Sequence, residues 1–372
     1  MKIGILTYHR AHNYGALLQA YALQTYLREL GHQTEIIDYW PDYHAEVYQL
    51  IPDFKILSFK GKIKSILLLM LGYSRMLKRS SLYKKFMREQ FSMPHQPRYP
   101  TKESMKELEY DVVVYGSDQI WRRVDYPLFQ GFSDVFYGAY PIKVKRKITY
   151  AASMGIIDVK EEDKSNLKQL LSNFDAISVR EQELKQLVDD LTGQSVAQVL
   201  DPVFLLEKEQ WMQLSPHPIL ANQEKYIFFY QLVASEEAIL LTNRLAAHYG
   251  YKVIEIRGRV DPLLFGDRYL QTRSPTDFIS LIKNAEIVVS TSFHGVAFAL
   301  LFEKQFYALG MKKNSGRVQS LLDNLGIPQR LLSDINLADF EEKIDYDKVT
   351  EKMTALKQQS KNYLIDALGI QN

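Results

Sequence analysis

Short runs of β-branched and aromatic residues alternate along the chain with longer stretches in which apolar residues recur every three or four positions. The short runs are typical of buried strands and the longer stretches of helices. Strands are predicted over residues 2–6, 35–38, 111–115, 147–151, 176–179, 226–230, 252–256, 287–290 and 305–308. Helices are predicted between them, notably over residues 14–30, 236–248, 275–284 and 296–302. This alternation predicts an α/β fold with parallel sheets.

The strands form two series, which predicts two Rossmann-like domains. Residues 1–202 are expected to form the N-terminal domain and residues 203–372 the C-terminal domain, in which a last helix is predicted over about residues 346–368. Ligands of such sheets bind beyond the carboxyl ends of the strands. A ligand-binding cleft is therefore expected where the two domains face each other.

One segment of the N-terminal domain is unusually basic. Residues 55–88 contain ten lysines and arginines and no acidic residue, and they include the apolar run 66–71. A basic helical insert is therefore predicted over about residues 55–90. We prefer the interpretation that this helix packs on the domain with a solvated basic face, and peripheral contact with an anionic membrane is the second interpretation. The apolar run is far shorter than the ~20 residues of a membrane span.

Composition narrows the classes of function. Of the 372 residues, 46% are hydrophobic and 24% are charged, which excludes a disordered chain or a coiled coil. The net charge is only +2, so no nucleic-acid partner is expected. The absence of cysteine excludes thiolate metal sites and a cysteine nucleophile. The first residues lack the features of a signal peptide, so a cytoplasmic protein is expected, with the inner face of the membrane as its secondary location.

The most informative segment is the predicted strand, turn and helix over residues 287–300. Thr291 or Ser292 is expected to cap the helix, and Gly295 to let its backbone approach a ligand closely. At the helix N-terminus, the dipole favours a neutral imidazole at His294 and an anion beside the first amides. Two interpretations remain open: a functional site, or a capping turn in which His294 forms only local hydrogen bonds.

Other polar residues follow predicted strands in the N-terminal domain. Ser117, Asp118 and Gln119, with Trp121 nearby, suit the recognition of sugar hydroxyls, but they also fit an ordinary turn with Asp118 as a helix cap and Trp121 in the core. The turn after the first strand, residues 13–16, contains a single glycine. It therefore gives only weak support to dinucleotide binding.

Basic side chains are expected at the same edge of the sheets. Arg180 follows the predicted strand 176–179, and Arg317 begins a helix after a loop that contains Lys312 and Lys313. Guanidinium groups bind phosphate and carboxylate through two parallel hydrogen bonds, whereas lysines act as point charges. Each of these residues alone is more often a surface charge, but together they supply what a small dianion requires.

Six short motifs occur in an order that is known from one family. The first motif runs from Asn13 to Leu23 and starts with Asn-Tyr-Gly-Ala. The other five are Gly116-Ser-Asp-Gln-Ile-Trp121, Tyr150-Ala-Ala-Ser-Met-Gly155, Ser178-Val-Arg-Glu181, Leu200-Asp-Pro202 and Ser290-Thr-Ser-Phe-His-Gly295. With these motifs the chain resembles the polysaccharide pyruvyl transferase family over residues 1 to about 330. The resemblance implies a fold similar to that of GT-B glycosyltransferases. It also implies phosphoenolpyruvate as the donor substrate, no further cofactor, and a sugar of a cell-surface polysaccharide or its precursor, free or lipid-linked, as the acceptor.

The resemblance assigns roles to individual residues. The family's histidine corresponds to His294, expected to shuttle protons, and Asp118 is a second acid or base or a sugar ligand. Expected donor contacts are Arg180, Ser292, Gly295, Lys312, Lys313 and Arg317, of which the last three compete for one contact. Expected acceptor contacts are Asn13, Tyr14, Gly15, Ser117, Gln119 and Trp121. No metal site is expected, because no carboxylate cluster is apparent.

Two other functions remain open at this point. The first is a sugar-nucleotide glycosyltransferase on the same architecture. Many such enzymes carry two glutamates eight residues apart in the last strand–helix unit, but Gly295 stands eight residues before Glu303 here. The second is a carbohydrate-binding relative without catalysis, against which His294 and the nearby basic residues argue.

Overall fold

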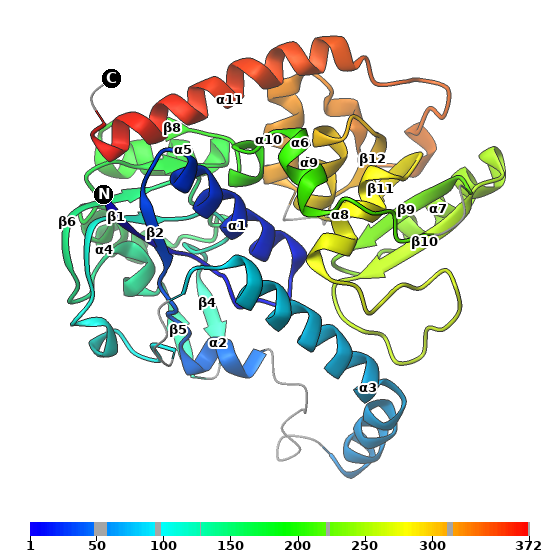
Figure 1. The fold of residues 1–372 in the computed structure, drawn as a ribbon, viewed down its shortest axis with the longest axis horizontal. Helices are drawn as coiled ribbons and strands as arrows, with labels where there is room; N and C mark the ends of the chain where they lie inside the picture. Colours follow the sequence, from blue (N-terminus) through cyan, green and yellow to red (C-terminus); the bar gives the residue numbers. More distant parts are fainter. Residues whose placement is uncertain (48–57, 94–97, 127, 221–223, 311–314, 371–372) are drawn as a thin grey trace.

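Two parallel sheets form the centre of the molecule (Figure 1). The computed structural model describes residues 1–47, 58–93, 98–126, 128–220, 224–310 and 315–370. The N-terminal sheet has the order β2 (Gln33–Ile36), β1 (Lys2–Leu6), β3 (Glu109–Tyr115) and β6 (Lys143–Thr149). The C-terminal sheet has the order β10 (Lys252–Arg257), β9 (Tyr226–Gln231), β11 (Ile287–Ser290), β12 (Gln305–Leu309) and β13 (Leu331–Leu332).

Helices connect the parallel strands, as such connections require. In the first half of the chain these are α1 (Tyr14–Glu29), α2 (Asp42–Val47), α3 (Phe59–Gln90), α4 (Glu161–Leu171) and α5 (Gln182–Thr192). In the second half, α7 (Glu236–Tyr249), α8 (Pro275–Lys283), α9 (Phe293–Leu301) and α10 (Gly316–Leu325) connect strands of the C-terminal sheet, α6 (Lys208–Leu214) precedes that sheet, and α11 (Tyr346–Leu368) follows it. The prediction of an α/β fold with two facing Rossmann-like units, as in GT-B-like proteins, is therefore confirmed.

One predicted strand differs from the structure. Residues 176–179 contain only the short strand β7 (Ser178–Val179), which pairs with β8 (Ala197–Gln198) in a separate two-stranded sheet. Single bridges join this segment to the chain around β6. A second small sheet pairs β4 (Val124–Tyr126) with β5 (Phe129–Gly131). Strands β4, β5 and β8, of two or three residues each, are too short to show a periodic pattern, so the sequence did not reveal them.

The two halves share one hydrophobic core, because α1 packs against α8 and α9. Tyr14 at the start of α1 stacks on Phe278 of α8, with ring centroids 4.7 Å apart. Helix α11, the red helix in Figure 1, runs from the C-terminal sheet back to the N-terminal half, where the Tyr363 hydroxyl donates to the carbonyl of Thr149 at 2.9 Å. The last helix therefore contacts both halves, although the sequence assigns it to the C-terminal domain.

Helix α3 occupies the region of the predicted basic insert, and its two ends differ. Near the C-terminal end, Tyr83, Phe86 and Met87 are buried in the core. Near the N-terminal end, several large apolar side chains are exposed. Within the described ranges, none of the helices has both the length and the apolar character needed to cross a bilayer.

Candidate active site

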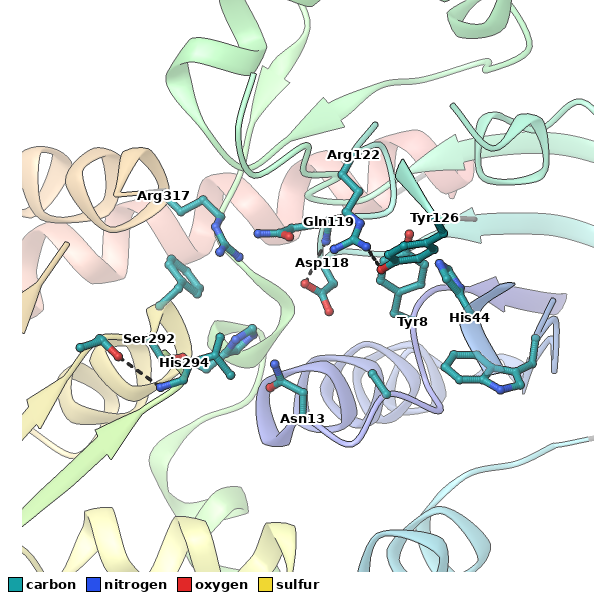
Figure 2. Close-up of a pocket in the computed structure, with 15 residues that line it drawn as sticks. Tyr8, Asn13, His44, Asp118, Gln119, Arg122, Tyr126, Ser292, His294 and Arg317 are labelled. Atoms are coloured by element: carbon teal, nitrogen blue, oxygen red, sulfur yellow. Dashed lines mark hydrogen bonds between the residues drawn. The ribbon is translucent and has the colours of Figure 1, made fainter. Parts of the chain in front are cut away.

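A cavity of about 220 Å³ lies between the two sheets, at the carboxyl ends of their strands (Figure 2). We call it the interdomain cavity. Its N-terminal wall consists of Tyr8, Ala11, Asn13, Trp40, His44, Asp118, Gln119, Arg122 and Tyr126. Its C-terminal wall consists of Leu232, Thr291, Ser292, Phe293, His294 and Arg317. The cavity occupies the position expected for a ligand of two parallel sheets.

The C-terminal wall is built on the turn between β11 and α9. The predicted cap is wrong, because the side chain of Ser292, at the N-cap position, forms no capping hydrogen bond. The backbone amide of Ser292 instead donates to Ser290 Oγ at 3.0 Å, and Thr291 Oγ1 accepts from the amide of Leu232 at 3.1 Å. The turn is thus tied to β9 and β11, and the first amides of α9 are left without a side-chain cap.

His294 lies in the first turn of α9 and is only 5% exposed. Its ring packs on Gly15 in the first turn of α1, where an added Cβ would come within 2.0 Å of His294 Nδ1. Asn13 fixes this turn by accepting a hydrogen bond from the amide of Gly15 at 2.9 Å. Gly15 therefore serves the close approach of the histidine, and the prediction that Gly15 binds the acceptor is replaced by this packing role.

Asp201 is a buried carboxylate behind His294 that the sequence analysis did not identify as a site residue. Its Oδ2 atom accepts from Arg180 Nη1 at 2.5 Å and from Ser117 Oγ at 2.9 Å, and lies 3.6 Å from His294 Nε2. Burial raises the pKa of Asp201, but His294 and Arg180 lower it more, so this pKa lies well below its usual range. A permanent carboxylate therefore links His294 to Arg180. The motif Leu200-Asp-Pro202 was the available signal.

The two arginines predicted to bind the donor occupy different positions. Arg317 lines the interdomain cavity and points into it (Figure 2), whereas Arg180 lines only a neighbouring cavity of about 180 Å³. Their guanidinium carbons lie 5.9 Å and 4.7 Å from the ring centre of Phe293. Burial, together with the charge of Arg180, lowers the pKa of Arg317 to about 10. Arg317 is thus charged at neutral pH in surroundings that an anion would stabilise.

Three predicted acceptor contacts do not reach the interdomain cavity. Trp121 is in the core, with its Nε1 donating to the carbonyl of Phe136 at 3.0 Å. Tyr14 is buried between α1 and α8, and its hydroxyl donates to the carbonyl of Arg273 at 3.0 Å. Ser117 is buried against Asp201. The structure therefore places these three side chains in the packed interior and not in the lining of the interdomain cavity.

Three further predicted donor contacts, Gly295, Lys312 and Lys313, are not found in the lining of the interdomain cavity among the described residues. A Cβ added to Gly295 would lie 2.1 Å from Ser290 Oγ, so this glycine permits close packing of the turn rather than the approach of a ligand. Lys312 and Lys313 lie outside the described residues. Ser292 and Arg317 are therefore the predicted donor contacts that line the interdomain cavity.

The N-terminal wall contains aromatic rings that the sequence analysis missed. The ring of His44 lies 4.7 Å from that of Tyr8 and 5.5 Å from that of Trp40. Burial, together with the charge of Arg122, lowers the pKa of His44 to about 3, so this ring is neutral. Tyr8 and Trp40 follow β1 and β2 along the chain. Their position beyond strand ends was a usable signal.

Three of the polar residues predicted to act in the site do line the N-terminal wall: Asn13, Asp118 and Gln119 (Figure 2). Asp118 has a φ of 73°, in the left-handed region, and its Oδ1 accepts from the amide of Gln119 at 2.9 Å. Gly155 passes so close to Gln119 that an added Cβ would lie 2.5 Å from its Nε2. The turn after β3 thus holds a carboxylate and an amide toward the cavity.

The sequence of the chain matches the model of one known protein family. A model of the polysaccharide pyruvyl transferase family matches residues 13–313, which is most of the chain. The chain belongs to the polysaccharide pyruvyl transferase family. The match includes both walls of the interdomain cavity, apart from Tyr8, Ala11 and Arg317. No curated protein matches the sequence of this pyruvyl transferase family member.

Solved structures of sugar-processing enzymes have a similar course of the chain. UDP-N-acetylglucosamine 2-epimerase from Rickettsia bellii is 13% identical, with 99% of this chain and 96% of that chain covered and a TM-score of 0.46. The glycosyltransferase SnogD from Streptomyces nogalater is 12% identical, with 97% of this chain and 95% of that chain covered and a TM-score of 0.42. The E. coli heptosyltransferase WaaC with ADP is 11% identical, with 96% of this chain and 100% of that chain covered and a TM-score of 0.40. At these values the likeness carries no information on activity.

The interdomain cavity of this pyruvyl transferase family member combines two kinds of chemistry. One wall presents an imidazole, a guanidinium and the uncapped amides of α9, which together suit an anion and a proton transfer. The other wall presents aromatic faces with a carboxylate, two amide side chains and the guanidinium of Arg122, which suit a polar ring. Among the described residues, no group of three or more His, Asp or Glu side chains is arranged to hold a metal.

Proposed function

We propose that the protein transfers the pyruvyl group of phosphoenolpyruvate to a sugar of a cell-surface polysaccharide or of its precursor, forming a pyruvate ketal. One observation carries the proposal: His294 and Arg317 stand together at the N-terminus of α9, facing a wall of aromatic and amide side chains. The family of the chain supports the choice of a pyruvyl donor.

His294 moves protons in the proposed reaction. An acceptor hydroxyl attacks C2 of the enol phosphate and gives its proton to the imidazole of His294, which delivers a proton to C3 so that C3 becomes a methyl group. Phosphate then leaves from C2, and a second hydroxyl of the same sugar adds there and loses its proton. The products are the cyclic ketal and inorganic phosphate, so no oxidant or further co-reactant is required. Asp118 is the second acid–base group or a ligand of the sugar.

Positive charge on the C-terminal wall binds the donor in this proposal. Arg317 and the first amides of α9 contact the phosphate or carboxylate, and both contacts become stronger as phosphate departs. Ser292 adds a hydroxyl beside them. Arg180 contributes its charge from the neighbouring cavity and holds Asp201, and Lys312 and Lys313 are the alternatives to Arg317 for the remaining basic contact.

The acceptor occupies the N-terminal wall. Asn13 and Gln119 form hydrogen bonds with its hydroxyl groups, and the rings of Tyr8 and Trp40 pack against its apolar face. The acceptor is a sugar that is either free or carried on a lipid. The reaction takes place in the cytoplasm in this proposal, and neither a metal nor a cofactor takes part.

Thermal unfolding in the presence of phosphoenolpyruvate, UDP or GDP tests the proposal. A donor present at 100 times its Kd stabilises the folded state by about 2.7 kcal/mol, so phosphoenolpyruvate should raise the Tm by several degrees. Stabilisation by a nucleoside diphosphate instead of phosphoenolpyruvate would identify a sugar-nucleotide glycosyltransferase. If none of the three binds, the protein is a carbohydrate-binding relative. Release of inorganic phosphate that requires an added acceptor sugar then measures the transfer itself.

A further inference from the structure

The N-terminal half of α3 exposes an apolar stripe to solvent. Ile63, Ile66, Leu67, Met70 and Leu71 follow one another at spacings that place them on one face of a helix. Their exposed fractions are 47%, 47%, 57%, 78% and 51%, respectively. A helix in a globular protein normally turns such a stripe toward the core. Here the stripe faces away from the protein.

Lysines accompany the stripe. Lys60, Lys64 and Lys78 are exposed and stand three, four or seven residues from members of the stripe, on the same side of the helix. No acidic residue occurs from residue 55 to residue 88. Along α3 up to residue 88, the charged residues that accompany the exposed apolar side chains are therefore all basic.

A loop of the C-terminal half continues this surface. Leu263 and Phe265, in the connection between β10 and α8, are 64% and 62% exposed. Leu263 joins an apolar groove whose other members are Lys60, Ile63, Lys64, Leu67, Leu68 and Leu71. We call the stripe, its three lysines and these two loop residues the α3–loop face.

Two arginines of α3 hold the loop against the helix. Arg75 donates to the carbonyls of Pro262 and Leu264 at 2.7 Å and 2.8 Å, and its guanidinium lies 4.5 Å from the ring centre of Phe265. Arg79 donates to the carbonyls of Arg257 and Gly258 at 2.9 Å and 3.1 Å. The face is thus assembled from both halves of the chain.

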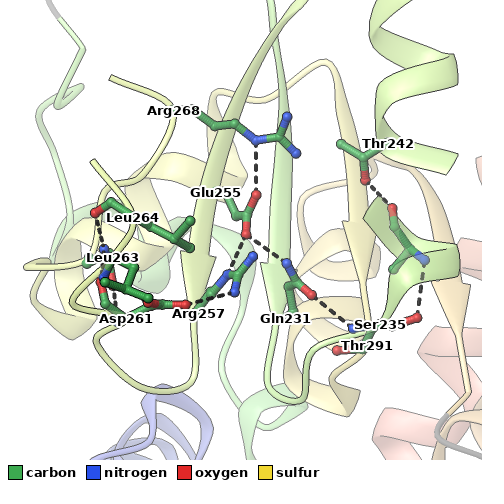
Figure 3. A network of polar contacts seen from close by, with 12 residues as sticks. Gln231, Ser235, Thr242, Glu255, Arg257, Asp261, Leu263, Leu264, Arg268 and Thr291 are labelled. Carbon is green, nitrogen blue, oxygen red and sulfur yellow. Dashed lines mark hydrogen bonds and ion pairs between the residues drawn. The ribbon is translucent and has the colours of Figure 1, made fainter. Parts of the chain in front are cut away.

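The loop is also anchored at its own ends (Figure 3). The buried carboxylate of Glu255 accepts from the Nε atoms of Arg257 and Arg268 at 2.7 Å and 3.0 Å, and from Gln231 Nε2 at 2.7 Å. The amide of Asp261 donates to the side chain of Gln271. The exposed positions of Leu263 and Phe265 therefore belong to a well-connected loop.

We propose that the α3–loop face docks on an anionic lipid bilayer. Apolar side chains bordered by lysines match the boundary of a bilayer, where lysine stems stay apolar while their amines reach the anionic head groups. A protein partner of ordinary composition would leave the lysines of α3 in this face without matching charge. The proposal rests on the residues of the face and does not depend on the identity of the donor.

Co-sedimentation with vesicles tests the proposal. The full chain should bind vesicles that contain phosphatidylglycerol at low salt, bind pure phosphatidylcholine far less, and dissociate as salt is raised. Replacing Lys60, Lys64 and Lys78 by glutamine should weaken binding by roughly 10- to 100-fold, because each lysine near an anionic surface contributes to the attraction. Leu67→Ser with Met70→Ser should weaken it as well, and so should Phe265→Ser.

Matched variants away from the face provide the control. Lys145, Lys252 and Lys348, with side chains 82%, 66% and 81% exposed, lie on other elements, and their replacement by glutamine removes the same charge. This control should bind vesicles as the unchanged protein does. Absence of binding to anionic vesicles at low salt, or equal losses in the face and control variants, would overturn the proposal.

Two further measurements distinguish a bilayer from a second copy of the chain and separate docking from donor binding. If sedimentation shows a dimer that Leu67→Ser with Met70→Ser converts to a monomer, the face joins two copies of the chain and the bilayer proposal is wrong. Thermal stabilisation by phosphoenolpyruvate should be the same in all face variants, which also shows that they fold. If phosphoenolpyruvate does not bind but the vesicles do, the proposed function fails and the docking proposal stands.

Discussion

The two walls of the interdomain cavity stand on equivalent ends of two parallel sheets, yet they carry different chemistry. The C-terminal wall places His294 and Arg317 beside the N-terminus of α9. The N-terminal wall is formed mainly by aromatic, amide and carboxylate side chains, among them Tyr8 and Trp40, and it also includes the guanidinium of Arg122. Both sheets present the carboxyl ends of their strands to the cavity, so the fold alone does not distinguish the two walls. The side chains on each wall determine what is bound there. This difference divides the proposed donor from the proposed acceptor.

A buried aspartate stands behind each wall, and the two differ in whether they reach a residue that lines the interdomain cavity. Asp38 accepts from His9 Nε2 at 2.8 Å and from Arg10 Nε at 2.5 Å. Burial raises the pKa of Asp38, but these hydrogen bonds lower it more, to about 2. Neither partner lines the interdomain cavity, whereas Asp201 approaches His294, which does. The carboxylate behind the N-terminal wall therefore stabilises the fold, and the one behind the C-terminal wall reaches the site.

The largest effect is expected from the removal of His294. His294→Ala should lower turnover by roughly 10²- to 10⁴-fold, the usual contribution of a positioned acid–base group. Affinity for phosphoenolpyruvate should change far less, because Arg317 and the α9 amides remain. His294→Gln keeps a hydrogen-bonding side chain without proton transfer and should be almost as impaired. Near-normal phosphate release by the glutamine variant would show that His294 is not a proton shuttle.

A methyl group at Gly15 is expected to have the next largest effect. Because the added Cβ would lie 2.0 Å from His294 Nδ1, Gly15→Ala must displace the imidazole. A displacement of about 1 Å can cost ~10²-fold in rate, so turnover should fall by roughly 10- to 100-fold. The same change in a His294→Ala background is the matched control and should cost little more. Equal losses in both backgrounds would show that Gly15 acts on α1 and not through His294.

Substitution of Arg317 is expected to affect donor binding, whereas substitution of Arg180 is expected to affect the stability of the fold. Arg317→Ala should weaken phosphoenolpyruvate binding by about 1.5–3 kcal/mol, or about 10- to 100-fold, the scale of a charged hydrogen bond. Arg180→Ala instead leaves Asp201 with an unpaired buried charge, so the free energy of unfolding should fall by about 3–5 kcal/mol. Calorimetric titration and urea unfolding of both variants measure the difference. Unchanged donor affinity in a folded Arg317→Ala protein would remove Arg317 from the site.

The sequence predicted most of this architecture, because the strands of a parallel sheet are short, almost continuously apolar runs between helices. The segment 287–290 was predicted with the bounds of β11, and His294 follows it in the cavity. The walls could be located as well, since the cavity of a parallel sheet lies beyond its strand ends. The direction of each side chain could not be derived in this way.

Trp121 and Trp40 illustrate this limit. Both follow a strand of the N-terminal sheet, but Trp121 turns inward to stack on Tyr137 at 5.1 Å, whereas Trp40 lines the interdomain cavity. Asp201 shows a second limit, because its partners Arg180 and His294 are far away in the sequence. Only the assembled fold brings these charges together.

The N-terminal wall should respond to substitution mainly through the acceptor. Gln119→Ala removes an amide that lines the cavity, and a single neutral hydrogen bond contributes about 0.5–1.5 kcal/mol. The KM for the acceptor sugar should therefore rise by roughly 2- to 10-fold, with donor affinity unchanged. Steady-state phosphate release at varied acceptor concentration measures this. A change confined to the KM for phosphoenolpyruvate would reverse the assignment of the two walls.

The smallest effect is expected from His44 and concerns stability rather than turnover. Burial and Arg122 lower the pKa of His44 from 6.5 to about 3, so its ring stays neutral in the folded protein while the unfolded chain takes up a proton below pH 6.5. The unfolded state therefore gains protons as the pH falls, and the contribution of His44 to the stability decreases by about 1 kcal/mol between about pH 7 and about pH 5.5. Urea unfolding at the two pH values measures this effect. From the higher to the lower pH, the free energy of unfolding of the His44→Gln protein should fall by about 1 kcal/mol less than that of the unchanged protein. His217→Gln, at an exposed position, is the matched control. An unchanged pH dependence in His44→Gln would mean that the folded protein also protonates this ring, and the N-terminal wall would then carry a titrating group as well.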